Sequence, residues 1–227
     1  ISTATAIVSR QQGDSIKSVD EDGQGNVVHA AAAAGVQQLV YISFKPFKHS
    51  FPMQAAKQHT EKQIAESGVP YTILQPTVFM EVWLSPALGF NYPEAKATIY
   101  GNGNNKISFI SQSDVARCAV ASIDNEKAIN KTIELGGPHA LTPLEAVHLF
   151  EEASGKKFET TMVPQEALEG QMAAAPDDIS KSFAGLTLGY AKGCEIDNTV
   201  ANEVFGIELK SVKAYAQQVA VPQAVAG

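Results

Sequence analysis

The sequence predicts an α/β fold built on a parallel sheet, followed by a smaller and mostly helical region. Two consecutive strand–helix units precede residue 80, and such units imply parallel strands joined by right-handed crossovers. The buried runs that end near residues 2, 42 and 74 lead into small, hydroxylated or proline-bearing segments. After Phe79 the strand–helix alternation is lost. These observations place the sheet in the first part of the chain.

The first unit consists of a helix and the strand that follows it. Residues 15–34 suit a helix, and Gly35 suits the position just after its C-terminus. Residues 39–42 then form a short apolar run that is typical of a buried strand. The positions of this helix expected to face the core are Val19, Val27, Val28, Ala31 and Ala34.

The second unit has the same order. Residues 52–67 predict a helix closed by Gly68, and residues 71–74 predict a strand that Pro76 stops. A loop with two lysines and a histidine, FKPFKHSFP, precedes the helix. Ordinary solvation explains that loop better than a site for an anionic substrate.

The segment after Phe79 predicts a short helix and then two strands, ATIY and ISFI, joined by GNGNN (101–105). A phosphate-binding loop should follow a strand and open a helix, and this one lies between two predicted strands. Because Asn and Gly tolerate positive φ, we expect a tight hairpin turn here instead.

Two further helices and two further strands complete the predicted elements. A helix capped by Ser113 should turn Val115, Cys118, Ala119 and Ile123 inward, and Asp114 suits its first turn. Residues 132–135 predict a strand. Thr142 caps the next helix, with Pro143 at its first position and Gly155 after its end. A short strand at 158–163 and Ala- and Leu-rich helices follow.

Composition excludes several classes of protein. The net charge is −7 and only two arginines occur, so the chain lacks the basic face that nucleic-acid binding needs. No apolar run approaches the roughly 18 residues of a membrane span. Cys118 and Cys194 have no CxxC partner, and the five histidines have no ligand spacing. We therefore expect two reduced, buried thiols rather than a structural disulfide, and no metal site.

Three strand ends carry the strongest functional signal. They are STAT (2–5), SFKP (43–46) and QPTVF (75–79). Parallel sheets bind ligands at the carboxyl ends of their strands, so we expect these segments to meet around a ligand.

Lys57 allows two interpretations. It lies on a helix that begins just after a strand-end loop, so it could reach back to the carboxyl edge of the sheet and bind a ribose hydroxyl or act on a nearby acid. Alternatively it pairs with Glu61, four residues later, on a solvated helix face.

The ordered set of segments resembles the NmrA-like, atypical short-chain dehydrogenase/reductases. The segments are NVVHAAAAAGVQQLVYISF, a Lys-bearing helix running into AESGVPYTILQPTVFMEVW, then SFISQSDVARCAV and TIELGGPHALTPLEAVHLFEEASG. The resemblance implies a Rossmann-like, doubly wound sheet over residues 1–156. It also implies that 157–227 is a mostly helical, substrate-side region rather than an independent domain.

The same resemblance implies that the chain starts at the family's fourth strand. Two strand–helix units, about 60 residues, would be missing in front of it. They include the glycine-rich turn that holds the cofactor pyrophosphate, so we expect weak binding of NADP or NAD. The strand at Ile1–Thr3 would then be an open edge, which favours a homo-oligomer or a separate segment that completes the sheet.

The resemblance also implies roles for particular residues. Ser2, Thr3 and Ala4 would lie along the ribose and nicotinamide, and Ser43 would lie beside the nicotinamide or substrate. Lys57 occupies the position of the family's active-site lysine. The remaining residues implied to line the nicotinamide pocket are Gln75, Pro76, Thr77 and Phe79.

One departure concerns the family's usual Tyr-x-x-x-Lys pair, whose tyrosine would fall at Met53. A thioether cannot donate a proton. The first hypothesis is a cytoplasmic NAD(P)-dependent oxidoreductase that transfers a hydride to a small carbonyl or quinone-like acceptor, with Lys57 and Ser43 in the catalytic site. The alternative is a non-catalytic regulatory protein that senses the dinucleotide. A third possibility is a chain with no role that involves the cofactor.

Overall fold

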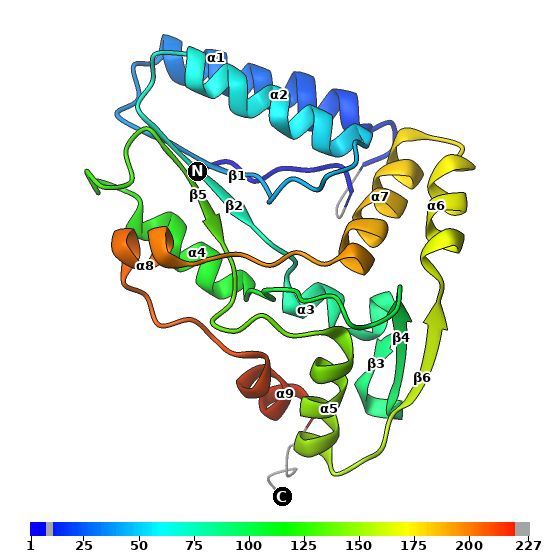
Figure 1. The fold of residues 1–227 in the computed structure, drawn as a ribbon. Coiled ribbons are helices and arrows are strands. Elements are labelled where there is room, and N and C mark those ends of the chain that lie inside the picture. The colour runs from blue at the N-terminus through cyan, green and yellow to red at the C-terminus, as the bar shows by residue number, and fades with distance from the viewer. Residues whose placement is uncertain (8–10, 221–227) are drawn as a thin grey trace, which may run out of the picture.

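A computed structural model describes residues 1–7 and 11–220 of the chain. Its main sheet contains three parallel strands in the order β1 (Leu39–Ile42), β2 (Tyr71–Pro76) and β5 (Lys131–Leu135) (Figure 1). The N-terminal segment adds a parallel bridge between Ser2 and Tyr41 on the outer side of β1. The predicted α/β class with a parallel sheet is confirmed.

Helices cover both faces of this sheet, as a doubly wound fold requires. Leu39 and Tyr41 of β1 pack with α1 (Gln24–Ala33) and α2 (Pro52–Glu66). Val40 points the other way and packs with α4 (Gln112–Ala121) and α8 (Thr199–Phe205). Successive side chains of a strand alternate between faces, so a strand buried on both sides is apolar throughout. This is why the sequence shows continuous apolar runs here.

The predicted helix at 15–34 is formed by two pieces. A π-helical segment, η1 (Ile16–Gly23), precedes α1, and Ser15 caps it in a reciprocal capping box with Ser18. Gly35 follows α1 with a φ of 62°, as predicted. Val28 and Ala31 are buried, but Val27 is 42% exposed and Ala34 is exposed too, so these two were assigned to the core wrongly. Ala34 is the C-cap residue after the end of α1, and the buried face of that helix is formed by Gln24, Gly25, Val28 and Ala31.

A second sheet lies away from the main one and contains β3 (Phe90–Asn91), β4 (Lys96–Tyr100) and β6 (Glu159–Val163). β4 pairs antiparallel with β3 and parallel with β6, so both of its edges are occupied. The predicted hairpin between ATIY and ISFI is therefore wrong. Ile107 instead bridges Leu141 and Cys194. GNGNN is still a turn, in which Gly101 and Gly103 adopt positive φ.

The helix over 112–121 also departs from the prediction at both ends. Its N-cap is Ser111, whose hydroxyl accepts the N–H of Ser113, so Ser113 lies inside the helix. Because the helix ends at Ala121, Ile123 falls beyond it and is 49% exposed. The predicted capping of α5 (Pro143–Ser154) by Thr142 is confirmed by a reciprocal capping box with Glu145.

The C-terminal part of the chain packs against the first part (Figure 1). Helix α7 (Asp178–Lys192) contacts α2, and α9 (Val212–Ala220) contacts α5. None of the helices in the described part of the chain is long and apolar enough to cross a membrane. The other helical segments are α3 (Met80–Trp83), η2 (Pro86–Leu88), η3 (Tyr92–Glu94) and α6 (Gln165–Ala173).

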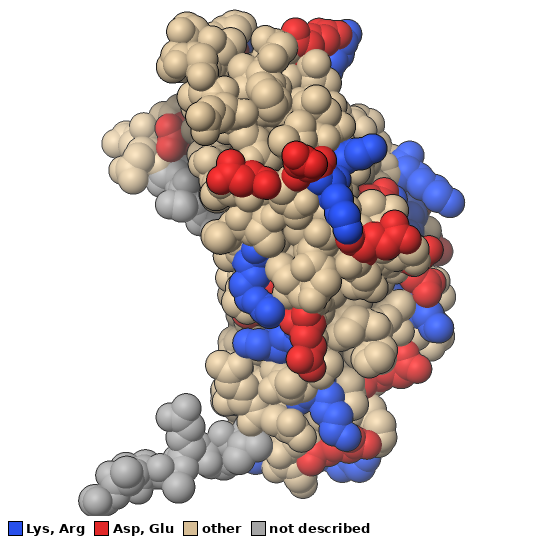
Figure 2. All heavy atoms as spheres, turned by 90° about the vertical axis from the view of Figure 1, so that its left-hand side faces the viewer, with Lys and Arg blue, Asp and Glu red and all other residues tan. Residues whose placement is uncertain are grey.

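Charged side chains are mixed on the face that Figure 2 shows, where acidic and basic residues lie next to one another. Exposed ion pairs of the molecule include Lys17 with Asp22 and Lys62 with Glu66. The basic residues on this face are scattered among acidic and uncharged ones and do not form a continuous patch.

Candidate functional site

A cleft with a volume of about 850 Å³ lies at the carboxyl ends of β1 and β2. Segment 3–7, the loop after β1 and the segment after β2 all contribute to its lining, so the three strand-end segments meet as predicted. The predicted site residues that line the cleft are Thr3, Ala4, Ser43, Lys57, Pro76, Thr77 and Phe79.

Main-chain pairing continues past the strand ends and fixes the floor of the cleft. Ser43 donates its N–H to Leu74, and Lys45 donates its N–H to Pro76, at 2.8 and 2.9 Å. The Thr77 hydroxyl donates to the carbonyl oxygen of Ser108. These bonds hold Ser43 and Thr77 in fixed positions on neighbouring strands.

Two predicted residues, Ser2 and Gln75, do not line the cleft. The Ser2 hydroxyl donates to the Gln24 side chain at 2.7 Å, and Gln24 in turn donates to the carbonyl of Ala4. The Gln75 amide donates to both carboxylate oxygens of Glu61, at 2.9 and 3.0 Å. Side chains alternate along β2, so Gln75 points toward α2. Ser2 and Gln75 thus form hydrogen bonds that stabilise the wall of the cleft without lining it.

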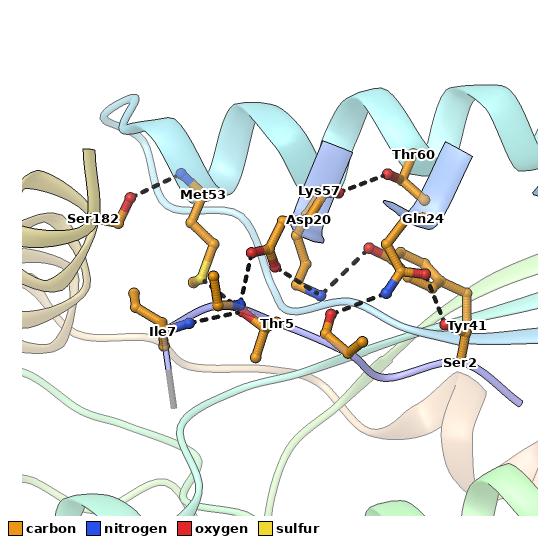
Figure 3. Close-up of polar contacts among 12 residues, drawn as sticks. Ser2, Thr5, Ile7, Asp20, Gln24, Tyr41, Met53, Lys57, Thr60 and Ser182 are labelled. Atoms are coloured by element: carbon orange, nitrogen blue, oxygen red, sulfur yellow. Dashed lines mark hydrogen bonds and ion pairs between the residues drawn. The ribbon is translucent and has the colours of Figure 1, made fainter. Parts of the chain in front are cut away.

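Lys57 lies inside the protein rather than on a solvated face. It is 5% exposed and lines the cleft, and its Nζ lies 3.9 Å from Oδ1 of Asp20 and 3.4 Å from the Tyr41 hydroxyl (Figure 3). Glu61 is bound to Gln75 instead, so the surface pair with Glu61 was the wrong interpretation. Burial lowers the pKa of Lys57, and the charge of Asp20 opposes that shift.

Asp20 is a part of this site that the sequence did not reveal. It is completely buried on η1, and its Oδ2 accepts the N–H of Ala6 at 2.9 Å. Its other oxygen, Oδ1, has no hydrogen-bond partner. Asp20 stands in the acidic run DED, which is typical of a solvated helix face, so no local signal distinguishes it from Glu21 and Asp22.

Met53 lies one helical turn before Lys57 and also lines the cleft. Its sulfur accepts a weak hydrogen bond from the Thr5 hydroxyl at 3.7 Å, and its N–H is bound by the Ser182 hydroxyl of α7 (Figure 3). No proton donor stands at this position. Lys57 is therefore the ionisable residue that α2 contributes to the described lining of the cleft.

Aromatic side chains form much of the remaining wall. Phe44 and Phe47 line the cleft, and they form a cluster of neighbouring rings with His49 and Phe51, at centroid distances of 5.6–6.3 Å. On the other side, Trp83 stacks on Tyr190 at 4.4 Å. Aromatic and aliphatic residues thus dominate the lining, and such walls suit flat, apolar ligands.

Lys45 is the second lysine of the cleft. It forms an ion pair with Glu134 of β5, so its charge is compensated within the protein. No Asp or Glu contributes to the described lining of the cleft. Lys57 therefore supplies the less compensated positive charge, because its carboxylate partner lies 3.9 Å away.

The described residues place no group of three or more His, Cys, Asp and Glu side chains where a metal ion could bind. Cys118 and Cys194 are both buried and free. The groups that the site offers to a ligand include the Lys57 ammonium, the Gln112 amide, hydroxyls such as that of Ser43, and main-chain atoms.

Comparison with known proteins relates this chain to one family. The profile of the NmrA-like family matches residues 1–216. Quinone oxidoreductase 2 of Escherichia coli is 31% identical over 182 residues, which cover 77% of this chain and 61% of that protein. Pinoresinol reductase 1 of Arabidopsis thaliana is 31% identical over 111 residues, covering 47% and 35% of the two chains.

Solved structures resemble the fold. The NADPH-dependent quinone oxidoreductase of Escherichia coli, solved with NADPH, matches with a TM-score of 0.69 at 23% identity, covering 86% of this chain and 70% of that one. Leucoanthocyanidin reductase of Vitis vinifera matches with a TM-score of 0.68 at 18% identity, covering 85% and 72%. The chain spans 35% to 48% of the length of the first three curated relatives.

Proposed function

Because this chain belongs to the NmrA-like family, we propose that it acts in NAD(P)-dependent reduction of a small carbonyl or quinone-like acceptor. The observation that carries the proposal is a buried lysine, Lys57, that lines an apolar cleft at the carboxyl ends of parallel strands. Ligands of doubly wound folds bind at this end of the sheet.

The residues present fit the nicotinamide–ribose end of such a cofactor. Thr3, Ala4 and Ser43 are small, so they leave room for a ring beside the strand ends. The ammonium of Lys57 has three N–H donors and one hydrogen-bond partner, the Tyr41 hydroxyl, among the described residues. Lys57 would bind the ribose hydroxyls, and Pro76, Thr77 and Phe79 would contact the nicotinamide. Ser2 and Gln75 would hold this wall in place.

When bound, the cofactor supplies the hydride. Reduction of a carbonyl or quinone oxygen also consumes a proton, and Met53 cannot provide one. We assign that proton to Lys57, relayed through a water molecule, with solvent then returning a proton to the amine. Lowering of the Lys57 pKa by burial favours this transfer.

The lining supports an apolar acceptor. Phe44, Phe47, Phe79 and Trp83 contribute to one continuous cleft, and the described lining contains no carboxylate. A flat quinone or aromatic carbonyl compound would bury its rings against these side chains. A highly charged or sugar-like substrate would leave many polar groups without partners there.

Steady-state assays with NADPH and NADH and a series of quinones and aromatic carbonyls test the proposal. They should use this chain and the longest natural protein that contains it. Lys57→Ala should lower turnover by roughly 10²-fold or more. Lys62→Ala, on the same helix but at an exposed position, should leave turnover unchanged. A protein that binds NADPH or NADH but oxidises neither with any of the quinones and carbonyls tested would refute an oxidoreductase.

A non-catalytic dinucleotide sensor is the second candidate, and Met53 favours it because the site lacks a direct proton donor. In that case Lys57→Ala should weaken cofactor binding several-fold while no variant turns over. Calorimetric titration separates the two cases, because it measures affinity independently of chemistry.

We infer in addition that the chain associates through its N-terminal edge. Ser2 pairs with β1 through both its N–H and its C=O, which leaves the opposite side of Ile1 and Thr3 open among the described residues. A second copy or a separate strand would pair there. Residues 157–220 would form the substrate side of the same unit, and the rest of the predicted range, 221–227, lies outside the described residues. Free, buried cysteines favour a reducing location such as the cytoplasm.

A further inference from the structure

The carboxylate of Asp20 connects two parts of the cleft wall. It lies on η1, is completely buried, and divides its two oxygens between different partners (Figure 3). Oδ2 accepts the N–H of Ala6, within the segment that carries Thr3, Ala4 and Thr5 to the cleft. Oδ1 accepts no hydrogen bond and faces the Nζ of Lys57 at 3.9 Å.

A buried carboxylate with an unsatisfied oxygen is unfavourable unless a charge of opposite sign stands beside it. The same holds for a buried ammonium. Asp20 and Lys57 come from different elements, and each is at least 94% buried at its side chain. The distance of 3.9 Å is too long for a hydrogen bond, so the attraction is electrostatic and leaves the N–H donors of Lys57 available to a ligand.

The other ionisable groups near Lys57 are few. Tyr41 from β1 lies 3.4 Å from Nζ, and its own pKa is raised well above its ordinary value by burial, so it stays neutral. Glu61 from α2 contributes a weaker charge effect and is bound to Gln75. The wall segment that Ala6 anchors offers only hydroxyl and apolar side chains.

We propose that Asp20 is a positioning residue for Lys57: its carboxylate keeps the buried amine protonated and facing the cleft, and through Ala6 it fixes the opposite wall. This inference deepens the proposed function, and its catalytic consequence rests on that function. The coupling between the two side chains does not, because it concerns charge and burial alone.

NMR titration of the Lys57 side chain, followed through its Cε resonance and assigned with Lys57→Arg, tests the coupling. Asp20→Asn removes the charge but keeps an oxygen that can accept the Ala6 N–H. We expect the midpoint of Lys57 to move to lower pH in Asp20→Asn. Asp22→Asn, which removes an exposed charge from the same segment, should leave the midpoint in place. An unchanged midpoint in folded Asp20→Asn would overturn the proposal.

A double-mutant cycle covers the case in which Asp20→Asn folds poorly. If Asp20 acts through Lys57, Asp20→Asn should destabilise the protein far less in the Lys57→Met background than in the wild type, or should stabilise it. If Asp20 served only as a structural acceptor for the N–H of Ala6, Asp20→Asn would lower the free energy of unfolding equally in both backgrounds. That result would refute the inference.

Catalysis provides a separate readout. Where the protein reduces an acceptor, the alkaline limb of its pH–rate profile should shift to lower pH in Asp20→Asn and should not shift in Asp22→Asn. Absence of any reductase activity would refute the proposed function and leave the titration and the mutant cycle to decide the role of Asp20. An active Asp20→Asn enzyme with an unshifted profile would refute the positioning role alone.

Discussion

Gly189 of α7 lies directly against the ring of Phe47, and a Cβ on this glycine would come within 2.6 Å of the ring carbons. One turn earlier, Gly185 lies equally close to Phe51. The two glycines thus let α7 approach the aromatic loop that follows β1. Because Phe47 lines the cleft, this contact also holds one of the lining side chains in place.

Substitution of Gly189 by alanine should therefore destabilise the protein. The added methyl has to displace the Phe47 ring, and overpacking of this kind costs about 1–3 kcal/mol. Gly170→Ala is the matched control, because Gly170 lies within α6 with open space where its Cβ would stand. That change should stabilise by up to about 1 kcal/mol. Urea unfolding of both variants measures the difference between their free energies of unfolding. Equal values would contradict the close packing of Gly189 against Phe47.

Stability should fall on the alkaline side. Burial raises the pKa of Cys118 and Cys194 from 9.0 to about 11. Between these values the unfolded chain releases protons that the folded chain retains, so the free energy of unfolding decreases as pH rises. Buried tyrosines, whose pKa values are also raised, add to this effect above about pH 10. Lys57 acts in the opposite sense, because its pKa is lowered on folding.

Urea unfolding at pH 8 and pH 10 under reducing conditions checks the alkaline effect. Removing both thiols, with Cys118→Ala and Cys194→Ala, should reduce the loss of stability between the two pH values. The quantity compared is the change in the free energy of unfolding between pH 8 and pH 10. The cavities that the substitutions leave lower stability equally at both pH values, so they do not affect this change. A wild-type stability that is constant or higher at pH 10 would show that the thiols do not titrate as expected.

Trp83 should report occupation of the cleft. It is the only tryptophan of the sequence, it lines the cleft, and it stacks on Tyr190. A quinone bound beside it should quench its fluorescence in a saturable way. N-Acetyltryptophanamide at equal absorbance corrects for light taken up by the quinone. Quenching that stays linear in quinone concentration would mean that the ligand does not bind at this cleft.

The N-terminal edge should govern association. Ile1 is 63% exposed next to Ser2, the residue that bridges β1. A lysine at such an edge opposes strand pairing, so Ile1→Lys should shift this chain toward the monomer. Light scattering at micromolar concentration measures the shift. Val120→Lys, an exposed apolar position on α4, is the control and should change nothing. A wild-type chain that is a monodisperse monomer would refute association through this edge.

Local chemistry in the sequence was enough to predict most elements of the main sheet. The apolar runs at β1 and β2 reflect strands buried on both faces, and the capping residues Thr142 and Gly155 act within one helical turn. The meeting of the three strand-end segments also followed, because parallel strands share the edge at which they end. Such properties depend on neighbours along the chain or on the direction of strands.

Tertiary structure decided the pairing of β4 and the partners of Lys57. β4 takes β6 as its parallel neighbour, about 60 residues later, and that choice left the segment at 107–110 without the predicted hairpin partner. Lys57 lies within reach of Asp20 because α2 packs on η1, whereas spacing along α2 favoured Glu61. A sequence pattern records which residue types alternate along one element. It does not record which elements pack together, and the burial that brings Asp20 and Lys57 together arises only from that packing.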